Sequence, residues 1–247
     1  MSVFCGEKDA VIVDCGVSTK YVENGLSVSG VDINRVAGII VTHTHTDHVS
    51  GLSPLIKKYK IPVFTDEIIK KELITTYKID PRLVRESNLE KGLKIGEFLV
   101  EGFRVSHDAQ ITYGYNISLD REKTSIITDA GFISDANLRA IEDCDNLILE
   151  SNYNEDLLYA NYKLPLYIKN RIASDCGHMS NENSAKILNK ILKNNKLKKF
   201  AVAHKSEENN SSDLIIDAII SALKINNIKD IGLNKMSIFL AKKVMSL

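Results

Sequence analysis

The sequence lacks the features that would place it in a membrane, in a secretory pathway or among disordered chains. Its longest uninterrupted apolar stretches, such as Val36–Val41, are far shorter than the roughly 20 residues that a membrane span needs. The first nine residues contain no basic segment followed by a long apolar core, so we expect no secretory signal. Of the 247 residues, 44% are apolar and 26% are charged, which excludes a disordered, a collagen-like and a coiled-coil chain.

Cysteine is also scarce, and the spacing of the cysteines does not indicate a metal site. The four cysteines, Cys5, Cys15, Cys144 and Cys176, are widely scattered and form no CxxC pair. This argues against a zinc ribbon and against a thioredoxin-like redox site. Sparse, unpaired cysteine is typical of a reducing compartment, so we expect a cytoplasmic protein in which these residues are small buried thiols.

No internal repeat, low-complexity tract or Pro/Gly-rich linker divides the chain, and its four prolines are dispersed. We therefore predict a single domain over residues 1–247. Short β-branched runs alternate in part with segments of helical spacing, which predicts an α/β protein whose sheets carry helices on their outer faces. The strands are expected at 10–13, 38–42, 63–65, 98–105, 113–119, 124–128, 146–150 and 200–203, and the helices at 49–59, 66–77, 134–141, 183–193 and 213–224.

The zero net charge, from 32 basic and 32 acidic residues, conceals a basic region. Between Lys163 and Lys205 the only acidic residues are Asp175 and Glu182, against ten lysines and arginines. Such a surplus could hold a polyanion such as nucleic acid. The alternative is the solvated face of a lysine-rich helix.

The polar residues with useful chemistry lie where apolar, strand-like runs end. His43, His107, Asp129 and His204 each come just after such a run, and Glu150 closes one. Loops at strand ends are supported by a rigid sheet and can bring together groups that are distant in sequence. We therefore predict that these five side chains serve one site.

Three of the six histidines fall within His43-Thr44-His45-Thr46-Asp47-His48. Alternation in an extended turn points His43 and His45 the same way, so that both imidazoles can bind one metal ion. Asp47 and His48 follow where the chain enters the next helix, displaced enough to serve a second ion. Imidazole and carboxylate ligands suit zinc, manganese or iron.

This HxHxDH motif resembles the signature of the metallo-β-lactamase superfamily. The resemblance implies a four-layer αββα sandwich with a metal site at one edge of its two sheets. It also implies that a further His, an Asp and a last His follow in that order, each at a strand end. The matching residues here are His107, Asp129 and His204.

The resemblance implies two divalent metal ions as cofactors. His43, His45 and His107 would bind the first ion, Asp47, His48 and His204 the second, and Asp129 would bridge them. A hydroxide held between the ions would then attack the substrate, with Asp47 counted among the catalytic groups. Two carboxylates against four metal charges leave a positive site that attracts an anion such as a phosphodiester.

Glu150 and His178 have ordinary explanations when each is taken alone. A strand-end Glu is often a polar cap, and the Gly177-His178-Met179-Ser180 turn could simply start a helix with Ser180 as its N-cap. The superfamily's phosphodiesterase branch, however, looks similar at both positions. That resemblance implies that Glu150 orients His178, which protonates the leaving oxygen. We also predict that Asn152, Ser180 and Asn181 contact substrate.

Matching segments in order from residue 13 to residue 210 resemble one narrower family, the YycJ/WalJ-type group of bacterial exonucleases. This resemblance implies a cytoplasmic enzyme of DNA repair that degrades DNA in the 5′-to-3′ direction. Three departures stand out. The opening strand and turn of the group are missing before residue 10, which would leave a sheet edge unpaired. Tyr153 and Asn154 replace His-Asp, and Lys205 replaces leucine.

We therefore predict a binuclear metal-dependent phosphodiesterase, a nuclease whose partner is DNA rather than RNA, with no membrane association. The alternative keeps the metal site but changes the substrate to a small ester, thioester, lactone or cyclic phosphodiester. Such enzymes do not generally need both Glu150 and His178. A non-catalytic binding protein is disfavoured because no expected ligand is missing. Nothing in the sequence indicates the oligomeric state.

Overall fold

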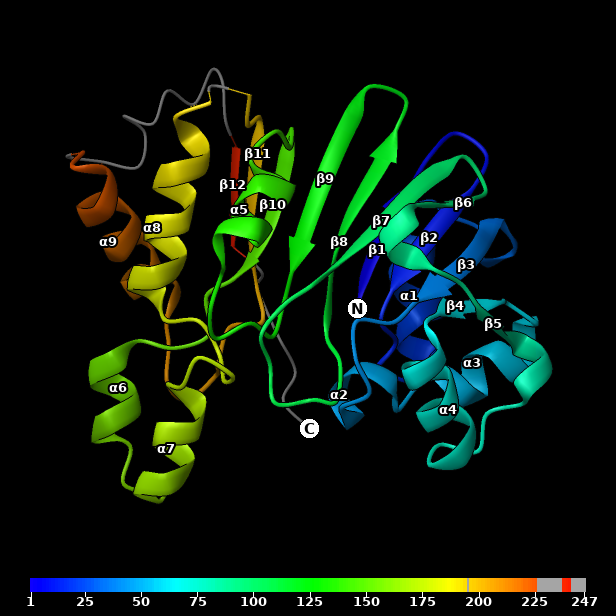
Figure 1. Ribbon diagram of the computed structural model, residues 1–247, viewed down its shortest axis with the longest axis horizontal. Coiled ribbons are helices and arrows are strands. Elements are labelled where there is room, and N and C mark those ends of the chain that lie inside the picture. Colours follow the sequence, from blue (N-terminus) through cyan, green and yellow to red (C-terminus); the bar gives the residue numbers. More distant parts are fainter. Residues whose placement is uncertain (195, 226–236, 241–247) are drawn as a thin grey trace. The chain divides into compact units, whose positions relative to one another are not determined.

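The computed structural model describes residues 1–194, 196–225 and 237–240 (Figure 1). The chain divides into two compact units, which we describe separately. The first unit comprises Met1–Phe103 and Ala109–Asp120, and the second comprises Arg104–Asp108 and the chain from Arg121 onward. A single domain over residues 1–247 stays a prediction.

The first unit contains a five-stranded sheet in the order β1-β2-β3-β4-β5. Strands β2 to β5 are parallel, and β1 pairs antiparallel with β2. Every residue of β2 is buried, as expected for a parallel strand that is covered on both faces. The bounds are β1 Ser2–Cys5, β2 Ala10–Val13, β3 Val36–Ile40, β4 Val63–Thr65 and β5 Val84–Glu86.

The presence of β1 corrects one expectation. A missing opening strand would leave a sheet edge unpaired, but Ser2–Cys5 runs antiparallel to β2 in the register Ser2↔Val13 to Cys5↔Ala10. The apolar run Val3-Phe4-Cys5 is too short to be recognised as a strand without its partner. The sheet neighbour, not the local sequence, fixes this strand.

A second set of strands in the first unit follows in the chain order β6, β7, β8, with β7 next to both others. Strands β6 and β7 form an antiparallel hairpin. The set comprises β6 Leu93–Ile95, β7 Phe98–Arg104, whose last residue belongs to the second unit, and β8 Tyr113–Leu119. In β7 the buried and exposed residues alternate, so that Phe98, Val100 and Gly102 face the interior.

The helices of the first unit bury apolar residues at helical spacing, such as Leu52, Leu55 and Ile56 in α3. They are α1 Thr19–Val28, α2 Thr46–Val49, α3 Leu52–Tyr59 and α4 Glu67–Thr75, with 3-10 turns at Ile33–Arg35, Pro81–Leu83 and Leu89–Lys91. The single helix expected over 49–59 is wrong in one respect. The chain breaks between α2 and α3, where the Gly51 N–H donates to the Cys15 carbonyl at 2.9 Å.

In the second unit four parallel strands lie in the order β9-β10-β11-β12. Strand β10 is central, and Leu147 and Leu149 of its apolar run are fully buried. The bounds are β9 Glu122–Ile127, β10 Asn146–Glu150, β11 Lys199–Ala203 and β12 Ser237–Leu240. Parallel strands end at the same edge of a sheet, which decides where the residues that follow them lie.

The second unit has five helices among its described residues: α5 Asp135–Ile141, α6 Glu155–Ala160, α7 Leu166–Ile172, α8 Asn181–Leu192 and α9 Ser212–Leu223. Helices α8 and α9 pack side by side, and α5 contacts α8 (Figure 1). Ser180 caps α8 by accepting from the Asn183 N–H, and Ser211 caps α9 in the same way through Leu214. Within the described residues, every helix is too short or too polar to cross a bilayer.

Candidate functional site

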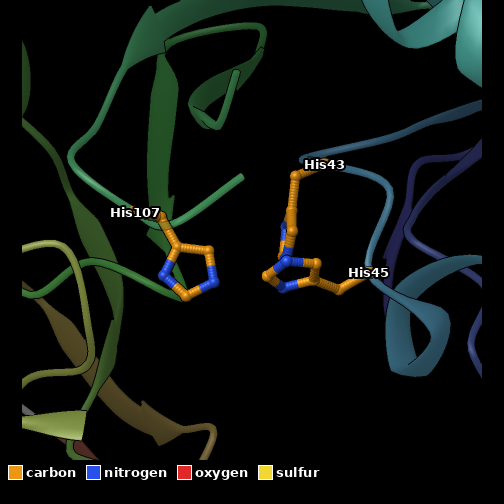
Figure 2. A group of neighbouring side chains, drawn as sticks. All are labelled: His43, His45 and His107. Atoms are coloured by element: carbon orange, nitrogen blue, oxygen red, sulfur yellow. The ribbon is translucent and has the colours of Figure 1, made fainter. Parts of the chain in front are cut away.

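The His43–His48 segment of the first unit follows β3 and runs into α2, as predicted. His43 is 0% exposed, and its ring centroid lies 4.6 Å from that of His45 and 4.2 Å from that of His48. Figure 2 shows the rings of His43 and His45 at close quarters. Three imidazoles from one short loop are therefore brought together within this unit.

Asp47 and His48 lie at the start of α2, one turn beyond the other two histidines. The Asp47 side chain is 56% exposed, whereas that of His48 is buried, and the His48 Nε2 lies 3.5 Å from the Asp47 Oδ2. The exposed carboxylate of Asp47 is accessible to a bound ion or molecule, while the buried imidazole of His48 is held in place by its neighbours. This is the displacement that the sequence predicts for the pair.

A buried carboxylate orients His48. Asp14, directly after β2, accepts from the His48 Nδ1 at 2.8 Å, from the Thr42 hydroxyl at 2.8 Å and from the Thr42 N–H at 2.7 Å. Burial opposes ionisation, but the charge and the hydrogen bond of His48 hold the pKa of Asp14 below its usual value. Since Nδ1 is engaged, Nε2 is the atom of His48 that can bind a metal ion.

Backbone contacts fix the histidine loop against the segment that follows β2. The Cys15 N–H donates to the His48 carbonyl at 2.7 Å. A Cβ on Gly16 would lie 1.5 Å from the Asp47 carbonyl oxygen, so this close approach requires glycine. From β8, the Tyr115 hydroxyl donates to the Val41 carbonyl at 2.6 Å, and the Tyr77 hydroxyl donates to the Thr44 carbonyl. The loop is thus pre-formed by its own unit.

In the second unit, Asp129, Glu150 and His204 lie at the carboxyl ends of three neighbouring parallel strands. The register pairs Leu149 with Ile127 and Glu150 with Ala203, so that the three strands end together. Asp129 and His204 have left-handed backbones, with φ of 55° and 52°. Such conformations cost about 1–3 kcal/mol each and cluster at functional sites.

Glu150 is the centre of this cluster and is 0% exposed. Its Oε1 accepts from the Nδ1 of His178 at 2.8 Å and from that of His204 at 2.7 Å, while Oε2 accepts from the N–H groups of Ala130 and Met179. Burial would raise its pKa, but the charges and hydrogen bonds of the two histidines lower it. The prediction that Glu150 lies beside His178 is confirmed, and its bond to His204 is new.

His178 is held on the turn between α7 and α8. Its N–H donates to the Ile172 carbonyl at 2.8 Å, and a Cβ on the preceding Gly177 would lie 2.2 Å from the Arg171 carbonyl oxygen. Burial lowers the pKa of His178, but the adjacent Glu150 carboxylate outweighs it and the net direction is upward. The ring therefore holds a proton to higher pH than an ordinary histidine does.

Asp129 lies among the histidines of the second unit. Its Oδ1 is 3.3 Å from the His204 Nδ1, 3.6 Å from the His178 Nδ1 and 3.8 Å from the His107 Nε2. Asp129, Glu150, His178 and His204 each offer one ligand atom, and these four atoms lie within 4.8 Å of one another. Imidazole nitrogens and carboxylate oxygens at this spacing fit a divalent transition-metal ion.

His107, the third residue labelled in Figure 2, comes from the short segment after β7 that belongs to the second unit. Its Nδ1 lies 3.0 Å from the Gly177 carbonyl oxygen, which makes Nδ1 the donor, and its Nε2 lies 3.3 Å from the Asp108 Oδ1 and 3.8 Å from the Asp129 Oδ1. Burial lowers its pKa, so the neutral form that binds metals is favoured at neutral pH.

The three residues expected to touch substrate have partners in the second unit. The Asn152 amide donates to the His204 carbonyl at 2.9 Å, and the Ser180 hydroxyl caps α8. Asn181 is 1% exposed and hydrogen-bonds to Ser151 and Asn210. These contacts tie the loops of His178 and His204 together. Contact with substrate stays a prediction for all three.

The departures from the resembled group are accommodated locally. Tyr153 is buried and its pKa rises to about 12, chiefly through that burial. Its carbonyl accepts from the Asn181 N–H at 2.9 Å. Asn154 caps α6 by accepting from the Leu157 N–H at 3.0 Å. Both substitutions therefore have structural roles beside the Glu150 cluster.

Sequence reasoning missed Asp14 as the carboxylate that holds His48. The signal was present, because Asp14 directly follows the apolar run Ala10–Val13, and the same strand-end rule selected His43 and Asp129. Only the contact with His48, which is 34 residues away in the chain, shows what Asp14 does.

Comparison with known proteins agrees with the fold. Residues 10–198 match the family described as the Beta-lactamase superfamily domain. The chain belongs to this superfamily. The metallo-β-lactamase fold predicted from the sequence is confirmed, with the mixed α/β architecture described above.

Among its relatives, the chain is 33% identical over 211 residues to Exodeoxyribonuclease YycJ of Bacillus anthracis, covering 84% of this chain and 78% of that protein. It is 30% identical over 223 residues to Exodeoxyribonuclease WalJ of Streptococcus pneumoniae, covering 87% and 81%. The crystal structure of the metallo-beta-lactamase fold protein YhfI from Bacillus subtilis superposes with a TM-score of 0.70 at 17% identity, covering 97% and 88%. The chain is a metal-dependent hydrolase related to the YycJ and WalJ exonucleases.

Proposed function

We propose that the chain is a binuclear metal-dependent phosphodiesterase, a nuclease that degrades DNA from the 5′ end toward the 3′ end. The observation that carries this proposal is Glu150, which binds His178 and His204 with one carboxylate oxygen. It links a candidate proton donor to a candidate metal ligand. The small-substrate hydrolases that share the HxHxDH motif do not generally need both Glu150 and His178, so the pair favours the phosphodiesterase.

The imidazole and carboxylate side chains named above suit divalent metal ions. We propose that His43, His45 and His107 hold one ion, that Asp47, His48 and His204 hold a second, and that Asp129 serves both. Zinc and manganese are the candidate metals, and iron suits the same ligands. When bound, the ions supply Lewis-acid polarisation of the phosphoryl group and lower the pKa of water.

The role of Glu150 and His178 follows from their geometry. The Glu150 carboxylate accepts from the His178 Nδ1, which leaves Nε2 to carry the proton that the departing oxygen receives. Glu150 raises the pKa of His178 against the effect of burial, which shifts the balance toward the imidazolium that can donate a proton. Asp14 performs the parallel positioning task for His48.

Sequence similarity to known proteins is the basis for proposing DNA as the substrate. It is also the basis for the direction of degradation and for a role in repair. The two relatives reported above are named exodeoxyribonucleases, and each is matched over more than three quarters of its length. The basic surplus between Lys163 and Lys205 supplies the charge that a nucleic acid requires. A cytoplasmic location is proposed on the same kinship and on the scattered, unpaired cysteines.

One experiment tests the proposal. Metal analysis of the purified protein is combined with single strands of DNA and RNA, labelled at the 5′ or the 3′ end. We expect about two metal ions per chain, release of short products from the 5′ end of DNA, and rates that fall steeply with salt. Hydrolysis of small esters or lactones without cleavage of any strand would contradict the proposal and favour the small-substrate alternative.

A further inference from the structure

The second unit contains a groove of about 570 Å³ that the proposed chemistry does not use. Its lining combines three residues of one helix face with an apolar floor and one aromatic side chain: Lys186, Lys190, Lys193, Ile187, Met179 and Phe132. A volume of this size is within the range of small-molecule and nucleotide sites. The charged and aromatic side chains of the lining indicate which class of ligand the groove can bind.

The three lysines form a stripe along α8 and its C-terminus. Their spacing of four and three residues places them on one face of the helix, and all three are exposed. Lys186 has a neutral partner, the Asn183 Oδ1 at 3.3 Å. No ion pair to a carboxylate is found for any of the three among residues 1–194, 196–225 and 237–240. Their charge is therefore available to an anion.

Phe132 provides a second and independent feature of the groove. Its side chain is 52% exposed, although Ile133, Met179 and Ile187 around it are buried. Its backbone is fixed by an antiparallel bridge to Ser106. An exposed aromatic ring on a fixed backbone, next to a row of cations, is the arrangement on which the bases of a single strand stack.

The groove is continuous in the chain with the proposed catalytic loops. Met179 directly follows His178, and Phe132 lies three residues after Asp129. Along α8 the lysines span about 10 Å at 1.5 Å per residue. One strand of stacked nucleic acid advances by about three nucleotides over that length, at about 3.4 Å per nucleotide. The three lysines are thus spread over about three to four phosphates, on a groove whose lining residue Met179 directly follows His178.

We propose that this groove binds single-stranded DNA, with successive phosphates on Lys186, Lys190 and Lys193 and one base stacked on Phe132. The proposal rests on the proposed nuclease function and specifies how that enzyme holds its substrate. Duplex DNA fits less well, because the bases that would stack on Phe132 are already paired and stacked.

The test measures binding of a fluorescent 12-nucleotide single strand with cleavage-resistant phosphorothioate linkages to the metal-loaded protein, as a function of salt. The first variant carries Lys186→Gln, Lys190→Gln and Lys193→Gln. Each lost phosphate contact removes about 0.7 from the slope of log affinity against log salt, so we expect a slope smaller by about two. The matched control changes three exposed lysines of the first unit, Lys20→Gln, Lys57→Gln and Lys94→Gln, and keeps the wild-type slope.

The second variant, Phe132→Ala, is expected to weaken binding between about fivefold and 150-fold with an unchanged salt slope. Phe132→Trp should bind the strand as tightly as the wild type does. That result would show that the weaker binding of Phe132→Ala is due to the lost ring and not to loss of folding. The groove is rejected if both the lysine triple and Phe132→Ala bind as the control does. RNA of the same sequence is expected to bind no more tightly, and tighter RNA binding would overturn the assignment to DNA.

These results are separable from the fate of the proposed function. A wild-type protein that binds the strand through the groove but cleaves no phosphodiester would contradict the nuclease and leave the groove in place. A wild-type protein that cleaves DNA, with groove variants that bind normally, would reject the groove and leave the nuclease in place.

Discussion

The two units assemble their candidate site residues by different routes. In the first unit the three histidines come from six consecutive residues, and the turn into α2 gathers them. In the second unit Asp129, Glu150, His178 and His204 come from four separate segments, and the common end of parallel strands gathers three of them. A local motif can be recognised directly in the sequence, whereas a cluster of residues at strand ends forms only if the strands pair in the right register.

The units also share one device, which they apply differently. Each has a buried carboxylate that accepts from a histidine Nδ1, Asp14 in the first unit and Glu150 in the second. Asp14 holds one histidine and the Thr42 loop, whereas Glu150 holds two histidines and two backbone N–H groups. More hydrogen bonds of the candidate site therefore depend on Glu150 than on Asp14. A substitution of Glu150 should disturb more side chains than a substitution of Asp14.

The largest effect is expected for His178→Ala. Removing a proton donor of this kind costs about 10²- to 10⁴-fold in rate, so phosphodiester turnover should fall by that factor while metal content is unchanged. Turnover of labelled DNA and metal analysis of the same samples provide the check. Asp175→Ala, an exposed change in the same loop, is the control and should retain full activity. Loss of metal from His178→Ala would show that His178 is a ligand.

A smaller effect is expected for Asp14→Asn, which replaces the carboxylate that orients His48. Changes of this type weaken metal affinity by about 10- to 100-fold. Competition with a chelator of known affinity measures the loss, and we expect one of the two metal positions to weaken more than the other. Equal affinity in the variant and the wild type would mean that His48 binds no metal.

Two glycine variants compare the loops that carry the histidines. Gly16→Ala in the first unit and Gly177→Ala in the second each force a Cβ against a carbonyl oxygen. Each should lower the free energy of unfolding by about 1–3 kcal/mol in urea denaturation. Gly25→Ala in α1 meets no atom within 4 Å and should instead raise it by about 0.5–1 kcal/mol. If Gly177→Ala left the free energy of unfolding unchanged, the turn before His178 would be able to shift and accommodate the added Cβ.

The smallest effect concerns the thiols, of which each unit has one buried and one exposed. Burial raises the pKa of Cys15 and of Cys144 to about 11, and both are 0% exposed, whereas Cys5 and Cys176 are exposed. At pH 8 about one buried thiol in a thousand is ionised. Two thiols should therefore react with an alkylating reagent in the folded protein and four in urea.

The same labelling tests the single-domain prediction. Cys15 reports on the first unit and Cys144 on the second. If the chain unfolds as one domain, both should become reactive over the same range of urea concentration. Separate ranges would contradict the prediction and show that the units unfold independently.

Much of the fold could be predicted because runs of β-branched and aromatic residues favour strands even when they are short. Strands β2, β4, β8 and β10 have the predicted bounds. The elements that were missed are short or mostly polar, such as β1, β5, α6 and α7. Their sequences carry little periodicity, and their structure depends on a neighbouring strand or on packing of the chain around them.

For the candidate site, the chain itself determined the residue types and their positions at strand ends, because apolar runs and the density of histidine in residues 43–48 are properties of sequence. Only the tertiary structure decided that Glu150 serves both His178 and His204, that Asp14 holds His48 and that Phe132 stays exposed beside the α8 lysines. Those contacts arise from the register of parallel strands and from the packing of loops, which join residues with no local relation in the chain.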